Sequence, residues 1–141
     1  MSAEDNKALV RRFVEEVNKH NVTALDEILA PNFSYHSPTY GDLDREGYKR
    51  RCEQGLTSYP DYHVTIDDLM AAEGDKVAVR LTDRGTDKGG SPAFGTPPTG
   101  RQIAVPGIGI VAIEGRRIAE IWIINDSLGA MQQLGLIPRR G

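Results

Sequence analysis

The chain has 141 residues, a formal net charge of −3 and a hydrophobic content of 39%. Its length is typical of one domain, since domains commonly run to roughly 100–200 residues, and its hydrophobic content is too high for a disordered chain. No apolar run reaches the ~18 residues of a membrane-spanning helix, and we interpret the scattered arginine pairs as solvated surface instead of a nucleic-acid-binding face. The pairs are Arg11-Arg12, Arg50-Arg51, Arg116-Arg117 and Arg139-Arg140. We expect one domain over residues 1–141, with no nucleic-acid or membrane partner.

The first residues and the cysteine content indicate the cellular compartment. Met1–Asp5 is polar and acidic, so we expect no signal peptide. Cys52 is the single cysteine and cannot form an internal disulfide, which fits a reducing environment. We therefore expect a cytoplasmic protein.

Two helices are predicted at the start of the chain. Residues 3–19 carry apolar side chains at the helical period, and Ser2 is the expected N-cap. The periodic positions are Leu9, Val10, Phe13, Val14 and Val17. A shorter helix is predicted over 22–29, with Asn21 as its N-cap and Pro31 preventing its extension.

A short strand and a third helix follow. Residues 33–37 are predicted as a strand that ends at Pro38, and a polar loop comes next over 40–42. The third helix is predicted over 45–58, and Pro60 follows its end because proline cannot continue a helix.

The second half of the chain has the pattern of β-strands, in which apolar and polar residues alternate. The predicted strands are 62–67, 77–82, 103–113 and 118–124. Residues 85–100 hold five Gly and three Pro, which predicts a loop. A final helix is predicted over 127–134, and we interpret Asp126 as its N-cap instead of a catalytic residue.

Helices first and strands afterwards indicate an α+β fold with an antiparallel sheet. Helices packed on one face of a curved sheet leave a pocket between the two layers. The order of elements resembles the NTF2-like cone, in which three N-terminal helices pack on a curved, mostly antiparallel β-sheet that encloses a pocket.

Several short motifs, in this order and spacing, narrow the resemblance to the SnoaL-like, or polyketide cyclase-like, branch of that superfamily. They are His36-Ser37-Pro38, Tyr59-Pro60-Asp61, Gly85-Thr86 with Gly89, Pro98-Thr99-Gly100, Arg117–Trp122 with Asp126, and Gln133-Leu134-Gly135. The resemblance covers nearly the whole chain and implies a small organic ligand and no cofactor.

The resemblance also shows where this chain departs from the family. Members that close polyketide rings carry an acid–base Asp on the last strand and a Gln and a His on the strand before it. These slots align here with Ile123, Gly107 and Gly109. We expect the two glycines to enlarge the pocket for a bulky, apolar, polyketide- or terpenoid-like molecule.

Three polar residues are candidates for catalysis. His36 is in a slot that resembles a pocket position and would act as a general base near neutral pH. Asp83 continues the apolar face of its strand and would be the partner or the acid, with a raised pKa. Asn125 shares a face with Ile121 and Ile123 and would donate to an enolate or carbonyl oxygen. The expected ligand-binding residues are Ser34, Tyr48, Cys52, Leu56, Leu81, Gly107, Gly109, Ile121 and Ile123.

Each candidate has a structural alternative. His36 can be a hydrogen-bonded structural histidine, Asp83 a strand-end carboxylate turned to solvent, and Asn125 an amide that caps local backbone. Residues 107–112 match G-x-G-x-x-A, but strand sequence follows instead of the helix that a dinucleotide site needs. The three histidines lack the short spacing of metal ligands, so we expect neither a cofactor nor a metal.

Two functions remain open. The first is a cofactor-independent cyclase or isomerase that abstracts a proton next to a carbonyl; the second is a non-catalytic small-molecule-binding protein. His36 and Asp83 close together on one cavity would favour the enzyme, whereas side chains pointing to different surfaces would favour the binding protein. An epoxide hydrolase is a weaker third alternative, because its Asp–Arg–Asp set is missing from the expected strand positions.

The outer face of the sheet predicts an assembly. Trp122 and Ile124 alternate away from the pocket side and would be exposed on a monomer. We therefore expect a homodimer that covers them.

Overall fold

The computed structural model describes residues 1–139, so Arg140 of the last arginine pair lies outside the described residues. The helices are α1 (Ala3–Asn18), α2 (Leu25–Ile28), α3 (Arg45–Ser58) and α4 (Ser127–Gln133), with a 3-10 turn at Val22–Ala24. The strands are β1 (Leu29–Ser37), β2 (Gly41–Asp44), β3 (His63–Ala72), β4 (Lys76–Thr86), β5 (Gln102–Glu114) and β6 (Arg117–Asn125).

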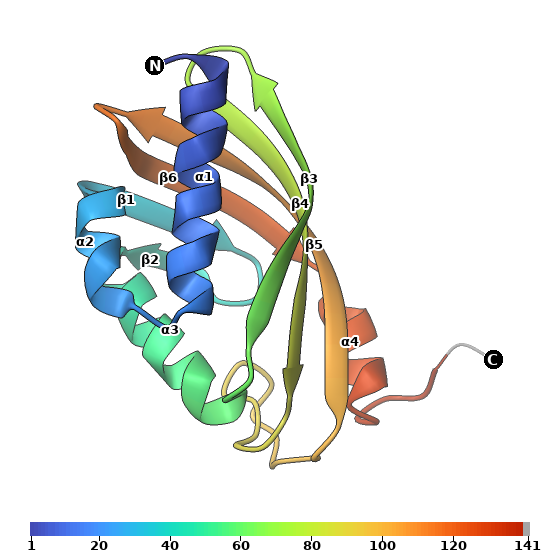
Figure 1. Cartoon of the computed structure of the whole chain (residues 1–141). Coiled ribbons are helices and arrows are strands. Elements are labelled where there is room, and N and C mark those ends of the chain that lie inside the picture. Colours follow the sequence, from blue (N-terminus) through green and yellow to red (C-terminus); the bar gives the residue numbers. More distant parts are fainter. Residues whose placement is uncertain (140–141) are drawn as a thin grey trace.

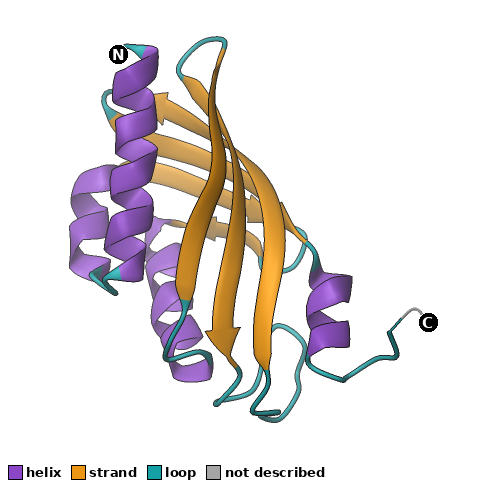
Figure 2. Cartoon of the chain, turned by 45° about the vertical axis from the view of Figure 1, so that its right-hand side comes forward, coloured by secondary structure: helices purple, strands orange, loops and turns teal. Residues whose placement is uncertain are grey.

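All six strands form one sheet in the order β2-β1-β6-β5-β4-β3. Every neighbouring pair is antiparallel except β1 and β6, which are parallel and join the first and last strands of the chain. Helices α1, α2 and α3 cover one face of the curved sheet, and α4 lies apart from them beside β5 (Figures 1 and 2). The predicted α+β class with helices on one face is confirmed.

Helix caps account for three of the four helix starts. Ser2 accepts a hydrogen bond from the Asp5 amide and the Asp5 side chain reaches back to Ser2, which is a capping box. Asp44 caps α3 through the Gly47 amide at 2.7 Å, and Asp126 caps α4 through the Gly129 amide at 2.9 Å, as predicted.

The second predicted helix, 22–29, is shorter than expected and Asn21 does not cap it. The Asn21 side chain instead donates to Glu16 of the preceding helix, and the segment divides into a 3-10 turn and the single α-turn of α2. The backbone becomes extended at Leu29, four residues earlier than predicted, and the irregular pairing between Leu29 and Ser34 accommodates Pro31 within β1.

Strand β2 was not predicted, because the polar residues 40–42 have the composition of a loop. Its residues pair with β1 in the register Ser34 to Asp44 and Ser37 to Gly41. Gly41 has a φ of 77°, which lets the chain reverse tightly between the two strands. The pairing puts Asp42 directly opposite His36.

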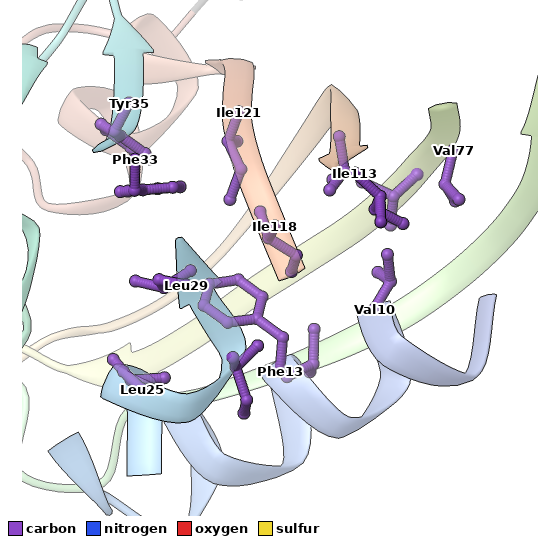
Figure 3. Close-up of a cluster of buried hydrophobic side chains, with 14 of the residues drawn as sticks. Val10, Phe13, Leu25, Leu29, Phe33, Tyr35, Val77, Ile113, Ile118 and Ile121 are labelled. Atoms are coloured by element: carbon purple, nitrogen blue, oxygen red, sulfur yellow. The ribbon is translucent and has the colours of Figure 1, made fainter. Parts of the chain in front are cut away.

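The hydrophobic core lies between α1–α3 and the concave face of the sheet. Val10 and Phe13 of α1 meet side chains from several strands there, and Ile28 and Ile118 are completely buried (Figure 3). Along β4 the buried positions alternate from Val77 through Leu81, and Asp83 is the next residue on that face. The core therefore ends where the polar side chains of the pocket begin. In the described range, no helix has the length and apolar character needed to cross a membrane.

Candidate functional site

A pocket of about 180 Å³ opens beyond the core, between α3, the ends of β4–β6 and α4. Helix α3 contributes one wall, with Tyr48, Arg51 and Cys52 facing the cavity. The loop after β4 contributes a second wall through Ser91–Phe94. Most of the lining is apolar or aromatic, so the few polar groups that reach the cavity are the candidates for chemistry.

Asp83 is held by two neighbours at the pocket wall. The Tyr62 hydroxyl donates to Oδ1 of Asp83 at 3.0 Å, and the Asn125 amide donates to Oδ2 at 3.1 Å. Each carboxylate oxygen therefore has a fixed donor from a different strand region. This arrangement orients the carboxyl group toward the cavity that all three residues line.

Burial raises the pKa of Asp83 above its ordinary value. The Tyr62 hydrogen bond and the positive charge of Arg51 oppose this effect but do not cancel it. A carboxyl group with a raised pKa gives up and takes back a proton closer to neutral pH, which is the property that general acid–base catalysis requires. Tyr62 stays protonated as a donor, because burial and the nearby Asp83 raise its own pKa strongly.

Arg51 brings a positive charge to the α3 wall of the pocket. Its guanidinium lies 3.6 Å from the centre of the Tyr40 ring and 5.8 Å from that of Tyr35, in cation–π contact with Tyr40. Its Nε is buried with no hydrogen-bond partner. Because Asp83 and Arg51 both line this pocket, they can bind or polarise an oxygen-bearing ligand between them.

The loop after β4, which forms the second wall of the pocket, is held in place by the fully buried carboxylate of Asp87. Asp87 accepts hydrogen bonds from the amides of Gly90 and Thr99, both at 2.9 Å, and from the Thr99 hydroxyl at 2.8 Å. The amides of Lys88 and Gly89 donate to the Ser58 carbonyl at the end of α3. A Cβ on Gly89 would lie 2.4 Å from the Thr57 carbonyl oxygen, so this close contact requires glycine.

The sequence-predicted residues that line the pocket come from three elements. Asp83 and Asn125 are within hydrogen-bond distance of each other, and Tyr48, Cys52 and Leu56 line the cavity from α3. Tyr48 is buried among the rings of Phe13, Phe33 and Tyr35. Burial raises the pKa of the Cys52 thiol, which keeps it in the neutral form and argues against a nucleophile.

The expectation that His36 lines the pocket is wrong. Phe33 and Tyr35 of β1 point into the core, so His36 points to the opposite face by the two-residue period of a strand. There its two ring nitrogens lie 2.9 Å from Asp42 and 2.7 Å from Glu120, and the ring stacks on Trp122. The Asp42 and Glu120 hydrogen bonds raise the pKa of His36. His36 and Asp83 therefore serve different surfaces.

Several expected ligand-binding residues also lie elsewhere. Ser34 is on the outer face and donates to Glu120. Leu81 and Ile121 are buried in the core, and Ile123 packs against it. The prediction that these four residues contact the ligand is therefore wrong. Ser34 lies on the outer face of the sheet, and the other three belong to the hydrophobic core or pack against it.

Gly107 and Gly109 do not enlarge the pocket as expected. Gly107 pairs with Asn125 across the ladder, and Gly109 pairs with Ile123. A Cβ on Gly107 would lie 2.5 Å from the Asn125 amide nitrogen, and one on Gly109 would lie 3.2 Å from the Ile123 Cδ1. The space above each glycine is thus occupied by its cross-strand neighbour, and Gly107 leaves room for Asn125 to reach Asp83.

Sequence reasoning missed Arg51, Tyr40 and Tyr62 as site residues. Arg51 was assigned to the surface as part of an arginine pair, yet it is three residues after Tyr48 and so shares its helix face. That spacing was the available signal. Within residues 1–139 no group of three or more His, Cys, Asp or Glu side chains is arranged to hold a metal.

The cone-shaped sheet, the helices on its concave face and the pocket at its open end define an NTF2-like α+β protein. The SnoaL-like polyketide cyclase family matches residues 8–134, and the chain belongs to this family. No curated protein matches the sequence.

Three solved structures illustrate the similarity. TsrD from Streptomyces laurentii is 29% identical with a TM-score of 0.85, covering 97% of this chain and 99% of TsrD. IdmH, a putative polyketide cyclase from Streptomyces antibioticus, is 28% identical with a TM-score of 0.81 over 92% and 98% of the two chains. A putative polyketide cyclase from Acidithiobacillus ferrooxidans is 34% identical with a TM-score of 0.79 over 94% and 95%.

Proposed function

We propose that the protein is a cofactor-independent enzyme that abstracts a proton next to a carbonyl and promotes cyclisation or isomerisation. The observation that carries the proposal is Asp83, a carboxyl group with a raised pKa, held by Tyr62 and Asn125 in an apolar pocket. Membership of the SnoaL-like polyketide cyclase family supports the reaction class. Asp83 replaces His36 as the proposed base.

The reaction conserves all atoms of the substrate. The Asp83 carboxylate takes a proton from the carbon next to a carbonyl, and the C–H electron pair moves onto the carbonyl oxygen to give an enolate. In a cyclisation, the enolate carbon then attacks a second carbonyl carbon of the same molecule. A C–C bond forms, and the resulting alkoxide recovers the proton from Asp83. No oxidant or reductant is consumed.

The proposed substrate is a bulky, largely apolar, polyketide- or terpenoid-like molecule. The aromatic walls formed by Tyr40, Tyr48 and Tyr59 suit a flat ring system. Asn125 is proposed to position Asp83, because its amide already donates to that carboxylate.

Exchange of an acidic C–H proton tests the proposal without knowledge of the natural substrate. The wild-type protein should catalyse deuterium incorporation into 2-tetralone or a naphthyl β-diketone in D2O, followed by NMR. Asp83→Asn should lower the rate by roughly 10²–10⁴-fold, the usual contribution of a positioned base. Asp68→Asn is the matched control, because Asp68 is exposed and bonds only to the adjacent amide. Equal rates in Asp83→Asn and wild type would refute the assignment.

A binding protein remains the second candidate, and one observation favours it. His36 and Asp83, the two residues whose proximity would favour an enzyme, point to opposite faces of the sheet. A protein that binds the naphthyl probes but does not accelerate exchange above the buffer rate would establish this alternative.

We further propose that the protein works as a cytoplasmic homodimer. Ile108, Ile110, Trp122 and Ile124 are exposed side by side on β5 and β6, on the face opposite the pocket. An apolar patch of this kind on a sheet favours burial against a second copy. The single Cys52, which forms no disulfide, fits a reducing compartment.

A further inference from the structure

Arg51 lacks the partner that a pocket arginine normally has. Its side chain forms no ion pair or hydrogen bond with any residue from 1 to 139, and its Nε is buried and unsatisfied. Aromatic rings surround it instead, with Tyr40 against one face of the guanidinium. A guanidinium has five N–H donors and stays charged, so this group is left with unused donors inside the pocket.

Burying a charge without a counter-charge is unfavourable, so an arginine with no acidic partner in a cavity points to an anionic group of a ligand. Asp83 is not such a partner. Its two oxygens accept from Tyr62 and Asn125, and it forms no ion pair with Arg51, because no Asp83 oxygen lies within 4.0 Å of an Arg51 nitrogen. No described residue therefore supplies an acceptor for Arg51, and a ligand in the cavity is placed to supply one.

We propose that the substrate carries a carboxylate, and that Arg51 binds this group through paired N–H donors while the apolar body of the ligand occupies the rest of the cavity. A planar carboxylate matches the guanidinium fork, and the contact is strongest when both are shielded from water. The stacking of Tyr40 on Arg51 fixes the plane of the fork. This inference rests on the proposed function, because it names the substrate class of the same pocket.

The positions of Arg51 and Asp83 also define how the substrate would lie in the cavity. Arg51 comes from α3 and Asp83 from β4, and both line one cavity. A carboxylate anchored on α3 holds the body of the ligand against the sheet, where Asp83 reaches an acidic C–H further along the molecule. Arg51 is thus a binding residue and Asp83 the residue that moves the proton.

Binding of a matched pair of probes tests the inference separately from catalysis. The probes are 2-naphthoate and its uncharged amide, 2-naphthamide, titrated by isothermal calorimetry at pH 7. Wild type should bind naphthoate more tightly, and Arg51→Met should weaken naphthoate roughly 10–100-fold while leaving naphthamide within about twofold. Arg51→Lys should fall between, because lysine keeps the charge but loses the fork.

Three controls accompany the binding measurements. Arg50→Met removes an exposed charge from the neighbouring position of α3 and should bind naphthoate like wild type. Arg51→Met should unfold at the same temperature as wild type or higher, because it removes an uncompensated charge; a clear drop in unfolding temperature would indicate a structural role in packing Tyr40 and would overturn the proposal. Asp83→Asn should keep naphthoate binding. Loss of deuterium exchange with retained naphthoate binding would then test the proposed base separately from the carboxylate site. Equal naphthoate affinity in Arg51→Met and wild type would also refute the carboxylate site.

Discussion

Substitution of Asp87 tests whether its hydrogen bonds hold the loop after β4 in place as a wall of the pocket. The side chain is fully buried and accepts three hydrogen bonds, from the Gly90 amide, the Thr99 amide and the Thr99 hydroxyl. Replacing Asp87 with Ala removes all three and leaves the Gly90 donor buried without a partner. The loop that carries Ser91–Phe94 would then lose its side-chain anchor to Gly90 and Thr99, and residue 87 would keep only its backbone hydrogen bonds to Gly100 and Arg101.

The magnitude follows from the hydrogen bonds. Each hydrogen bond to a charged group contributes about 1.5–3 kcal/mol to stability. The alanine variant no longer has to desolvate a carboxylate, and this gain offsets part of the stability lost with the three hydrogen bonds. We expect Asp87→Ala to lower the free energy of unfolding by about 2–4 kcal/mol, in the range of other broken buried networks. Thr99→Val removes the hydroxyl alone and should cost about 1 kcal/mol.

Urea unfolding followed by circular dichroism measures these changes. Asp68→Ala is the control, and an exposed substitution of this kind should stay within about 0.5 kcal/mol of wild type. Asp87→Ala should also weaken 2-naphthoate binding, because Ser91–Phe94 line the cavity. A loss in unfolding free energy below about 0.5 kcal/mol would show that the hydrogen bonds to Asp87 do not hold the wall.

Three further predictions concern the rest of the molecule. Asp126→Ala should lower the free energy of unfolding by about 0.5–2 kcal/mol through loss of the α4 cap, while 2-naphthoate binding is retained; unchanged stability with lost binding would contradict this. Light scattering at micromolar concentration should give a dimer, and Trp122→Glu a monomer, because the exposed patch on β5 and β6 is the proposed interface. NMR titration should give His36 a pKa above 6.5, and Asp42→Asn should lower it. Since the folded pKa of His36 is raised, its stabilisation of the fold is complete below its unfolded pKa of about 6.5 and is lost as pH rises through the folded pKa. A stability advantage of wild type over His36→Gln that grows as pH rises would contradict this pH dependence.

Local rules in the sequence determined the bounds of α3, the caps of α1 and α4, and the face of β4 on which Asp83 lies. The predicted third helix, 45–58, agrees with α3 at both ends. Ser2 and Asp126 cap their helices as predicted, because a cap needs only a side-chain oxygen and an amide two or three residues away. The alternation along β4 put Asp83 on the core face for the same reason, since the period of a strand is a local property.

The same local rule was available for His36 but was outweighed by the resemblance. Phe33 and Tyr35 alternate with Ser34 and His36, so the apolar pair already indicated which face of β1 is buried. The parallel pairing of β1 with β6 then brings His36 beside Trp122, although the two are far apart in the sequence. No local pattern contains that pairing.

The tertiary structure alone decided which charges are buried. Arg50 and Arg51 are adjacent and chemically identical, yet one is solvated and the other faces the pocket, because the sheet and Tyr40 cover only one side of α3. Likewise, Gly107 and Gly109 do not enlarge the pocket that holds Asp83, since Asn125 and Ile123 of the neighbouring strand lie against them. Desolvation depends on everything that packs around a group, and those neighbours come from distant parts of the chain.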